Sequence, residues 1–411
     1  MTAATDAPPR ARGSYAAVLA VREFRAVFAA HLLSLLGVVV CELALSVLVF
    51  RLTGSPLLSA LTFALGFLPY LVSGTLLSGV ADRFPARRVL VVCDLLCATA
   101  AAVMALPGMP VPALLALRCV SALVAPVFSG TRAATLGDVL GDGDLFVLGR
   151  SLIRLVSQGA QLIGFAAGGL LLTVLAPRTA LVLTVTGFLA SAALLRLGTR
   201  RRSARVRRAP SAPSAPSVPG GPGGTRRLLA DRRIRALTLL VWTPPFFLVV
   251  PEALAAPYAD AVGAGSVGAG LLMCGTPVGA VVGEVLAGTL LSPRARERVA
   301  LPAAALCLLP FTVFAWRPPL LWALPALVLV GAGMLYTLGV DRWFVDAVPE
   351  ELRGRAMTLQ VSGLMTVQGL GMAAGGAVAE WVPVHWVIAG TGAVGALVTG
   401  LVVRWVRSAR T

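Results

Sequence analysis

Three charged side chains stand inside long apolar stretches of the sequence and are the first candidates for chemistry: Glu42, Arg118 and Glu252. A charged group at the centre of a helix in hydrocarbon costs roughly 2.5–3.5 kcal/mol on insertion scales, so such groups are usually functional. A carboxyl group among apolar neighbours favours its neutral form, which suits a group that takes up and releases protons. Arginine stays charged and cannot carry the proton itself. We therefore expect Glu42 and Glu252 to couple to protons or contact substrate, and Arg118 to influence a nearby carboxylate or bind an anionic substrate.

Each of these residues also has a purely structural interpretation. Glu42 can be a structural carboxylate that is bonded to a neighbouring span. Glu252 lies in a stretch interrupted by prolines, which places it near the outer surface. Arg118 can extend its head group toward an interface, although its position seven residues into a predicted span makes this costly. Asp94 is expected to pair with nearby arginines, and His31 to be a packed or interfacial histidine.

The elements that must position these residues are membrane-spanning helices. The chain has 411 residues, of which 57% are hydrophobic and 13% charged, a composition too apolar for a soluble domain of this size. Apolar runs of about twenty residues, long enough to cross a bilayer as a helix, recur along its whole length. The hydropathy pattern predicts twelve spans: 26–50, 57–80, 88–107, 111–134, 152–176, 179–198, 234–257, 266–291, 298–316, 319–341, 356–380 and 384–406.

The arginines predict the orientation of these spans. The net charge of +17 would suggest nucleic acid as the partner of a soluble protein, but here the arginines lie mostly between spans. The arginines fall at the termini or at connections on one side of the membrane, with four exceptions: Arg51, Arg118, Arg178 and Arg317. The excess of positive charge on cytoplasmic loops therefore places both termini in the cytoplasm, in a multi-pass protein of the cell membrane.

The chain divides into two similar halves. Residues 199–233 are rich in arginine, proline, serine and glycine, which predicts a flexible cytoplasmic linker. With an offset of 210 positions Glu42 aligns with Glu252 and Arg132 with Arg342, and with an offset of 207 Gly168 and Gly169 align with Gly375 and Gly376. The predicted organisation is a cytoplasmic lead (1–25), two six-helix halves (26–198 and 234–406) joined by the linker, and a cytoplasmic tail (407–411).

Residues 77–88, LSGVADRFPARR, form a short charged hinge between two apolar runs. The hinge resembles the loop between helices 2 and 3 of the major facilitator superfamily of transporters, with the pattern G-x-x-x-D-R-x-G-R-R matched at Asp82, Arg83, Arg87 and Arg88. Ser78 and Pro85 replace the two usual glycines. Asp82 can accept hydrogen bonds at the N-terminus of a facing helix. We expect it to contact the eleventh span, after Arg353 and Arg355, and so close the cytoplasmic side; alternatively these charges only fix topology.

Further motifs narrow the resemblance. VPEELRGR at 348–355 resembles the branch of the superfamily that contains macrolide efflux proteins and the enterobactin exporter. LRCVSA around Arg118 is similar to the arginine motif R-x-x-x-G of the fourth span, with alanine in place of glycine. Small residues at helical spacing permit close helix packing. In the fifth span these residues are Gly164, Gly168 and Gly169, and in the eleventh they are Gly375 and Gly376. The fifth span keeps the glycines of an exporter motif but lacks its proline.

The resemblance implies an all-α integral membrane fold with twelve helices in two parallel six-helix repeats. Its implied function is export of an amphipathic small molecule, a drug or natural product, in exchange for protons. The chain has no lysine and hence no nucleotide-binding loop of the usual type, and no spacing suggests a metal site, a cofactor or an enzyme. The alternatives are an importer or uniporter of a small nutrient, or a non-transporting sensor or assembly partner. We expect a monomer whose partners are substrate, protons and lipid, with no nucleic acid.

Overall fold

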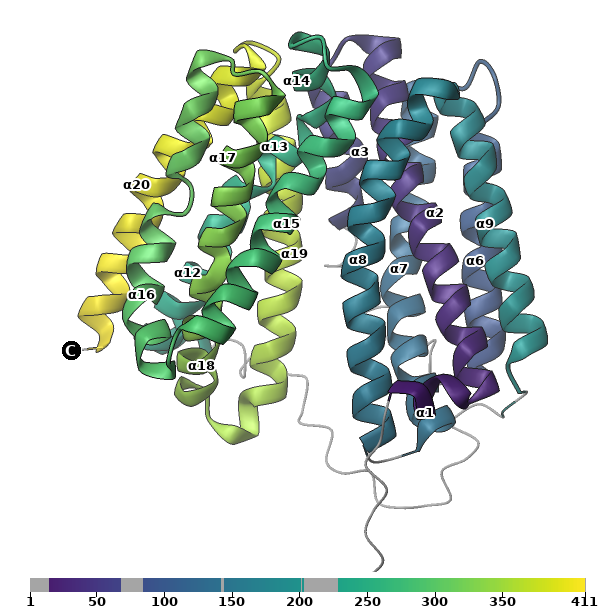
Figure 1. Cartoon of the computed structure of the whole chain (residues 1–411), viewed down its shortest axis with the longest axis horizontal. Helices are drawn as coiled ribbons and strands as arrows, with labels where there is room; N and C mark the ends of the chain where they lie inside the picture. The colour runs from purple at the N-terminus through teal and green to yellow at the C-terminus, as the bar shows by residue number, and fades with distance from the viewer. Residues whose placement is uncertain (1–14, 68–83, 142–143, 201, 203–227, 411) are drawn as a thin grey trace, which may run out of the picture.

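The computed structural model describes residues 15–67, 84–141, 144–200, 202 and 228–410, and the regular structure in these ranges is helical throughout (Figure 1). Helices are what apolar stretches of this length must form in a bilayer, because hydrocarbon offers no partner to an open backbone N–H or C=O group. The first group of helices comprises α1 (Tyr15–Ala20), α2 (Arg22–Thr53), α3 (Pro56–Phe67), α6 (Ala86–Met104), α7 (Val111–Leu140), α8 (Asp144–Val174) and α9 (Pro177–Gly198).

The second group of helices is more interrupted than the first. Its members are α12 (Arg232–Leu248), α13 (Val250–Ala253), α14 (Ala255–Ala261), α15 (Gly265–Leu290), α16 (Pro293–Leu306), η1 (Leu309–Trp316), α17 (Leu320–Gly333), η2 (Met334–Tyr336), α18 (Thr337–Ala347), η3 (Glu350–Leu352), α19 (Arg353–Val378) and α20 (Val384–Arg410). The predicted seventh span is thus broken into α12, α13 and α14. Prolines cause breaks of this kind because they remove a backbone donor and crowd the preceding turn.

Ten helices in the described ranges are long and apolar enough to cross a membrane. The second predicted span begins as α3, and its continuation lies outside the described residues. The third corresponds to α6, which has 19 residues and includes Arg87, Arg88 and Asp94. The ten helices and these two shorter ones occupy the positions of the twelve predicted spans.

The two helix groups stand side by side and meet at one end, at the top of Figure 1. There α8 packs against α15 and α3 packs against α19. Ser55, just before α3, donates a hydrogen bond of 2.5 Å to Glu380, just after α19, and the Leu57 backbone N–H donates one of 3.0 Å to the same carboxylate. Toward the opposite end the groups diverge (Figure 1).

Candidate functional site

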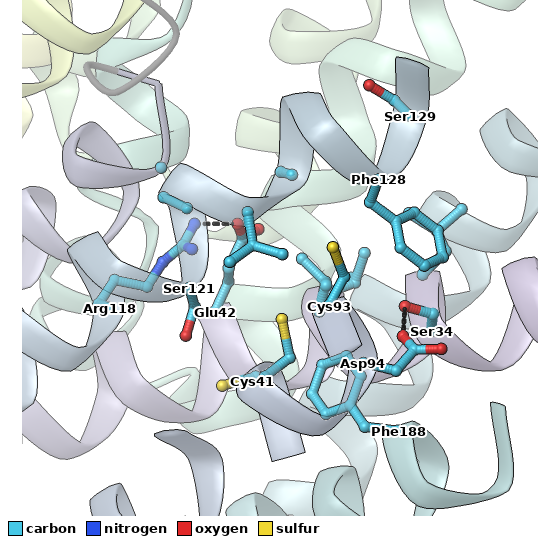
Figure 2. A pocket seen from close by; sticks show the side chains of 18 of the residues that line it. Ser34, Cys41, Glu42, Cys93, Asp94, Arg118, Ser121, Phe128, Ser129 and Phe188 are labelled. Carbon is cyan, nitrogen blue, oxygen red and sulfur yellow. Dashed lines mark hydrogen bonds and ion pairs between the residues drawn. The ribbon is translucent and has the colours of Figure 1, made fainter. Parts of the chain in front are cut away.

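A cavity of about 320 Å³ lies within the first helix group (Figure 2). Its walls come from α2, α3, α6, α7, α8 and α9, and Met365 of α19 reaches it from the second group. Aliphatic, aromatic and cysteine side chains make up most of the lining, and a few polar groups are spaced along it. The candidate site therefore offers an apolar surface with a small number of charged and hydrogen-bonding groups.

Glu42 and Arg118 form an ion pair in the wall of this cavity. Arg118 Nη2 bonds to Glu42 Oε1, and Arg118 Nε donates a 3.0 Å hydrogen bond to the backbone oxygen of Thr62 on α3. The Arg118 side chain is 7% exposed and that of Glu42 is 21% exposed. The pair thus balances two charges that would each be costly alone, and leaves part of the carboxylate accessible from the cavity (Figure 2).

The approach of Arg118 to α3 depends on a small residue. The guanidinium group lies directly against Gly66, so that any side chain at this position would displace it. The sequence singled out Glu42 and Arg118 separately, as charges in apolar stretches. The structure brings them together and adds Thr62 and Gly66, which carry no distinguishing signal in the sequence.

Asp94 of α6 is 1% exposed and accepts hydrogen bonds from two serine hydroxyls. Ser34 Oγ of α2 donates at 3.0 Å and Ser191 Oγ of α9 donates at 2.5 Å. The prediction of an arginine partner for Asp94 is therefore wrong within the described residues. The hydroxyl groups solvate the carboxylate in place of a cation, and they join three helices at the cavity wall.

His31 is packed, as predicted, and lies at the same end of the cavity as Asp94. Its Nε2 is 2.7 Å from Ser157 Oγ of α8, and its Nδ1 contacts the guanidinium group of Arg132 on α7. Arg132 also lies over the ring of Phe128, with 5.7 Å between Cζ and the ring centroid. This end of the cavity thus has a cation and several hydrogen-bonding groups, which composition alone did not predict.

Three cysteines, Cys41, Cys93 and Cys97, line the cavity with free thiols. No group of three or more histidine, cysteine or acidic side chains in the described ranges has the arrangement of a metal site. The cysteines therefore contribute a polarisable, mostly apolar lining.

The remaining predicted residues lie elsewhere. Glu252 is half-buried on α13, in the second helix group, and is not among the residues that line this cavity. Arg87 and Arg88 lie in the first turn of α6, and Arg353 and Arg355 in the first turn of α19. Asp82 and Arg83 lie outside the described residues, so the predicted contact between the hinge and the eleventh span stays a prediction.

The predicted packing glycines lie at close helix contacts. Gly164 and Gly168 of α8 face α2, and Gly375 of α19 faces Val250. Gly169 faces α15, where a methyl group added to it would lie 2.8 Å from the Ser266 carbonyl oxygen. Gly376, its counterpart in the second half, approaches the backbone of α3 in the same way. These two glycines of the internal repeat thus lie at the contacts of α8 with α15 and of α3 with α19, which join the helix groups.

Known protein structures share the fold of this chain. No curated protein sequence matches the chain. A crystal structure of the nucleoside transporter NupG matches with a TM-score of 0.71 and 15% identity, covering 92% of this chain and 98% of that chain. A POT family transporter in complex with 5-aminolevulinic acid matches with a TM-score of 0.72 and 10% identity, covering 97% and 98%. These structures are similar in fold over nearly the full length.

A family model described as Major Facilitator Superfamily matches residues 27–340, which is more than half of the chain. The members of this family are membrane transporters and not enzymes. The predicted fold class and the prediction that the chain is not an enzyme are therefore confirmed. This protein belongs to the Major Facilitator Superfamily and is a multi-pass secondary transporter.

Proposed function

We propose that this transporter exports an amphipathic small molecule, such as a drug or natural product, in exchange for protons. The observation that carries the proposal is the Glu42–Arg118 ion pair in the wall of a largely apolar cavity. An amphipathic cargo matches such a lining, since its apolar part can replace water against the aliphatic and aromatic side chains.

Glu42 is the group that titrates in this proposal. When its carboxylate is charged, Arg118 neutralises it, and the Thr62 carbonyl oxygen holds the guanidinium group in place. When Glu42 is protonated, the attraction between the two side chains falls and Arg118 is left with a weaker partner. Protonation therefore changes the interactions between α2 and α7, which can bias the transporter toward one of its two states.

Transport in this proposal follows alternating access, with the halves 26–198 and 234–406 rocking against each other. Both termini and residues 199–233 are on the cytoplasmic side in this proposal. The helix groups meet at the end that carries Gly169 and Glu380. With the proposed orientation this end faces the outside, and the proposal assigns the structure to the state that is closed there. The direction of transport rests on the resemblance of residues 348–355 to the efflux branch.

A second candidate is an importer of a small polar nutrient. It is favoured by the polar side chains His31, Arg132 and Gln161 in the cavity lining, which offer hydrogen-bonding groups to a polar substrate. Solved structures of similar fold include a nucleoside transporter and proton dependent oligopeptide transporters, although at this identity the likeness extends only to the fold.

The test uses membrane vesicles in both orientations. Inside-out vesicles with a respiration-acidified lumen receive a panel of macrolides and other lipophilic compounds, and a pH-sensitive dye reports protons leaving the lumen. Right-side-out vesicles receive nucleosides and dipeptides, and the dye reports proton entry. Proton release by a lipophilic compound, absent from vesicles that lack the protein, supports export. Proton entry with a nucleoside or dipeptide, and no release by any lipophilic compound, overturns export in favour of import.

A further inference from the structure

Helix α6 begins and α9 terminates at the same end of the first helix group (Figure 1). Residues near these two helix ends line a second cavity. It has a volume of about 640 Å³, and Arg87, Arg88, Arg196 and Arg202 line it together with Val91 and Val92. We call it the arginine pocket. None of its lining residues contacts the cavity that holds Glu42, so it is a distinct site.

Two of the four arginines are held by the protein. Arg202 donates hydrogen bonds of 2.5 and 2.8 Å to the two carboxylate oxygens of Glu23, and Arg87 donates one of 3.2 Å to the Thr199 carbonyl oxygen. Asp138 of α7 adds a second nearby carboxylate that attracts Arg202. These contacts hold two of the guanidinium groups that line the pocket.

The other two arginines remain available. Arg88 and Arg196 are exposed, and neither has an ion pair or side-chain hydrogen bond to another described residue. Four guanidinium groups around one cavity repel each other, and Glu23 and Asp138 offset only part of their charge. The first turn of α6 adds the partial positive charge of a helix N-terminus. The pocket is therefore suited to an anion with several acceptor oxygens, and phosphate is the group that arginine forks match best.

The surroundings of the pocket indicate where that phosphate comes from. Val91 and Val92 form its apolar side, and Val92, Leu95 and Leu96 continue as an exposed apolar surface along α6. The ends of membrane-spanning helices lie at the depth of lipid headgroups, and basic pockets between such helices bind anionic headgroups. A lipid places its phosphate among the arginines and its acyl chains against the apolar surface. A free phosphate ion would contact the arginines but not the apolar surface.

We propose that the arginine pocket binds the headgroup phosphate of one anionic phospholipid, whose acyl chains lie along α6 and α9. The bound lipid offsets part of the excess positive charge of the pocket and links the two helices that form it.

Binding is tested on the purified full-length protein with phosphatidylglycerol and phosphatidylcholine, by native mass spectrometry of the bound lipids. The test variant is Arg88→Gln/Arg196→Gln, whose changes are exposed and should leave folding intact. The matched control is Arg404→Gln/Arg407→Gln, which removes two exposed arginines from the last turns of α20. We expect wild type to retain one phosphatidylglycerol in preference to phosphatidylcholine, the test variant to bind it about tenfold more weakly, and the control to match wild type.

Three results would overturn the proposal. Equal retention of the two lipids would show that the pocket does not select charge. Equal weakening in the two double variants would show a general effect of surface charge. Displacement of phosphatidylglycerol by millimolar glycerol phosphate would assign the pocket to a free phosphate compound.

Melting curves of all variants check that the fold is retained, and a charge-retaining Arg88→Lys/Arg196→Lys variant should recover part of the binding.

Discussion

Glu42 on α2 and Arg118 on α7 form a partly buried ion pair, although 76 positions separate them in the chain. The pair lies against α3 through the Thr62 carbonyl oxygen and Gly66. Three helices of one half thus meet at a single charged contact in the cavity wall. A change in the charge of Glu42 therefore acts on all three helices.

Removal of one partner of the ion pair should be more harmful than removal of both. Arg118→Gln leaves the Glu42 carboxylate in an apolar wall without a cation, and we expect a loss of roughly 3 kcal/mol in the free energy of unfolding. Glu42→Gln/Arg118→Gln removes both charges and should recover most of that loss. Thermal or chemical denaturation in detergent measures the free energy of unfolding of both variants. Equal stability of the single and double variants would show that the pair does not interact as described.

Asp94 should have a structural role that an amide can fulfil. Asp94→Asn can still accept a hydrogen bond from Ser34 or Ser191, so we expect a loss of stability of about 1 kcal/mol or less and unchanged coupling to protons. Asp94→Leu leaves the buried Ser34 hydroxyl without its acceptor, while Ser191 can still donate to the Ala30 carbonyl oxygen at 2.9 Å, and the change should cost about 1–3 kcal/mol. Melting temperature and substrate-induced proton release are the measurements. A stable Asp94→Asn protein that has lost proton release would instead make Asp94 a coupling residue.

The contact between Gly169 and Gly270 should be needed to close one end of the transporter. A methyl group on Gly270 would lie 2.5 Å from the Phe165 carbonyl oxygen and 3.0 Å from Gly169 Cα. Gly270→Leu should therefore separate α8 from α15 and favour the state open at this end. The measurement is labelling of a cysteine introduced at Ser266 by a membrane-impermeant maleimide. We expect faster labelling in Gly270→Leu and no change in Gly288→Leu, whose added side chain meets open space on the same helix. Equal labelling rates in both would contradict the role of this contact.

Glu380 should stabilise the same closed end through α3. Its carboxylate accepts bonds from Ser55 and from the Leu57 backbone N–H, at the positive end of the α3 dipole. Because the site is exposed, we expect Glu380→Gln to weaken closure by only about 0.5–1 kcal/mol. A distance measurement between spin labels on α3 and α19 should show a larger open population than in wild type. Glu350→Gln, an exposed change at the other end of α19, is the control, and an identical shift in the two variants would contradict the role of Glu380.

The fold was largely predictable because hydropathy reports directly on what a bilayer requires. Each predicted span corresponds to a helix or a set of consecutive helical segments where its residues are described; of the second span only residues 57–67 are described. The breaks were harder to place. The tenth predicted span is divided into α17, η2 and α18, and neither end of η2 coincides with a proline. Local backbone geometry of this kind depends on packing as well as on sequence.

The site was predictable only in part. Charge in an apolar stretch singled out Glu42 and Arg118, but nothing in the sequence indicates that they touch. Asp94 shows the limit most clearly. Its nearest charged residues in the sequence are Arg87 and Arg88, yet its hydrogen-bond partners come from α2 and α9, because helix rotation decides which side chains face each other.

The most direct test of the account compares wild type with Glu42→Gln in reconstituted vesicles, once a substrate of the panel is known. Two quantities are measured: accumulation of the substrate driven by a pH gradient, and exchange of labelled for unlabelled substrate without a gradient. Glu284→Gln, an exposed change on α15 away from the cavity, is the control. If Glu42 couples transport to protons, Glu42→Gln loses accumulation but keeps exchange, while the control keeps both. Accumulation at the wild-type level in Glu42→Gln would contradict this prediction and remove Glu42 as the coupling group.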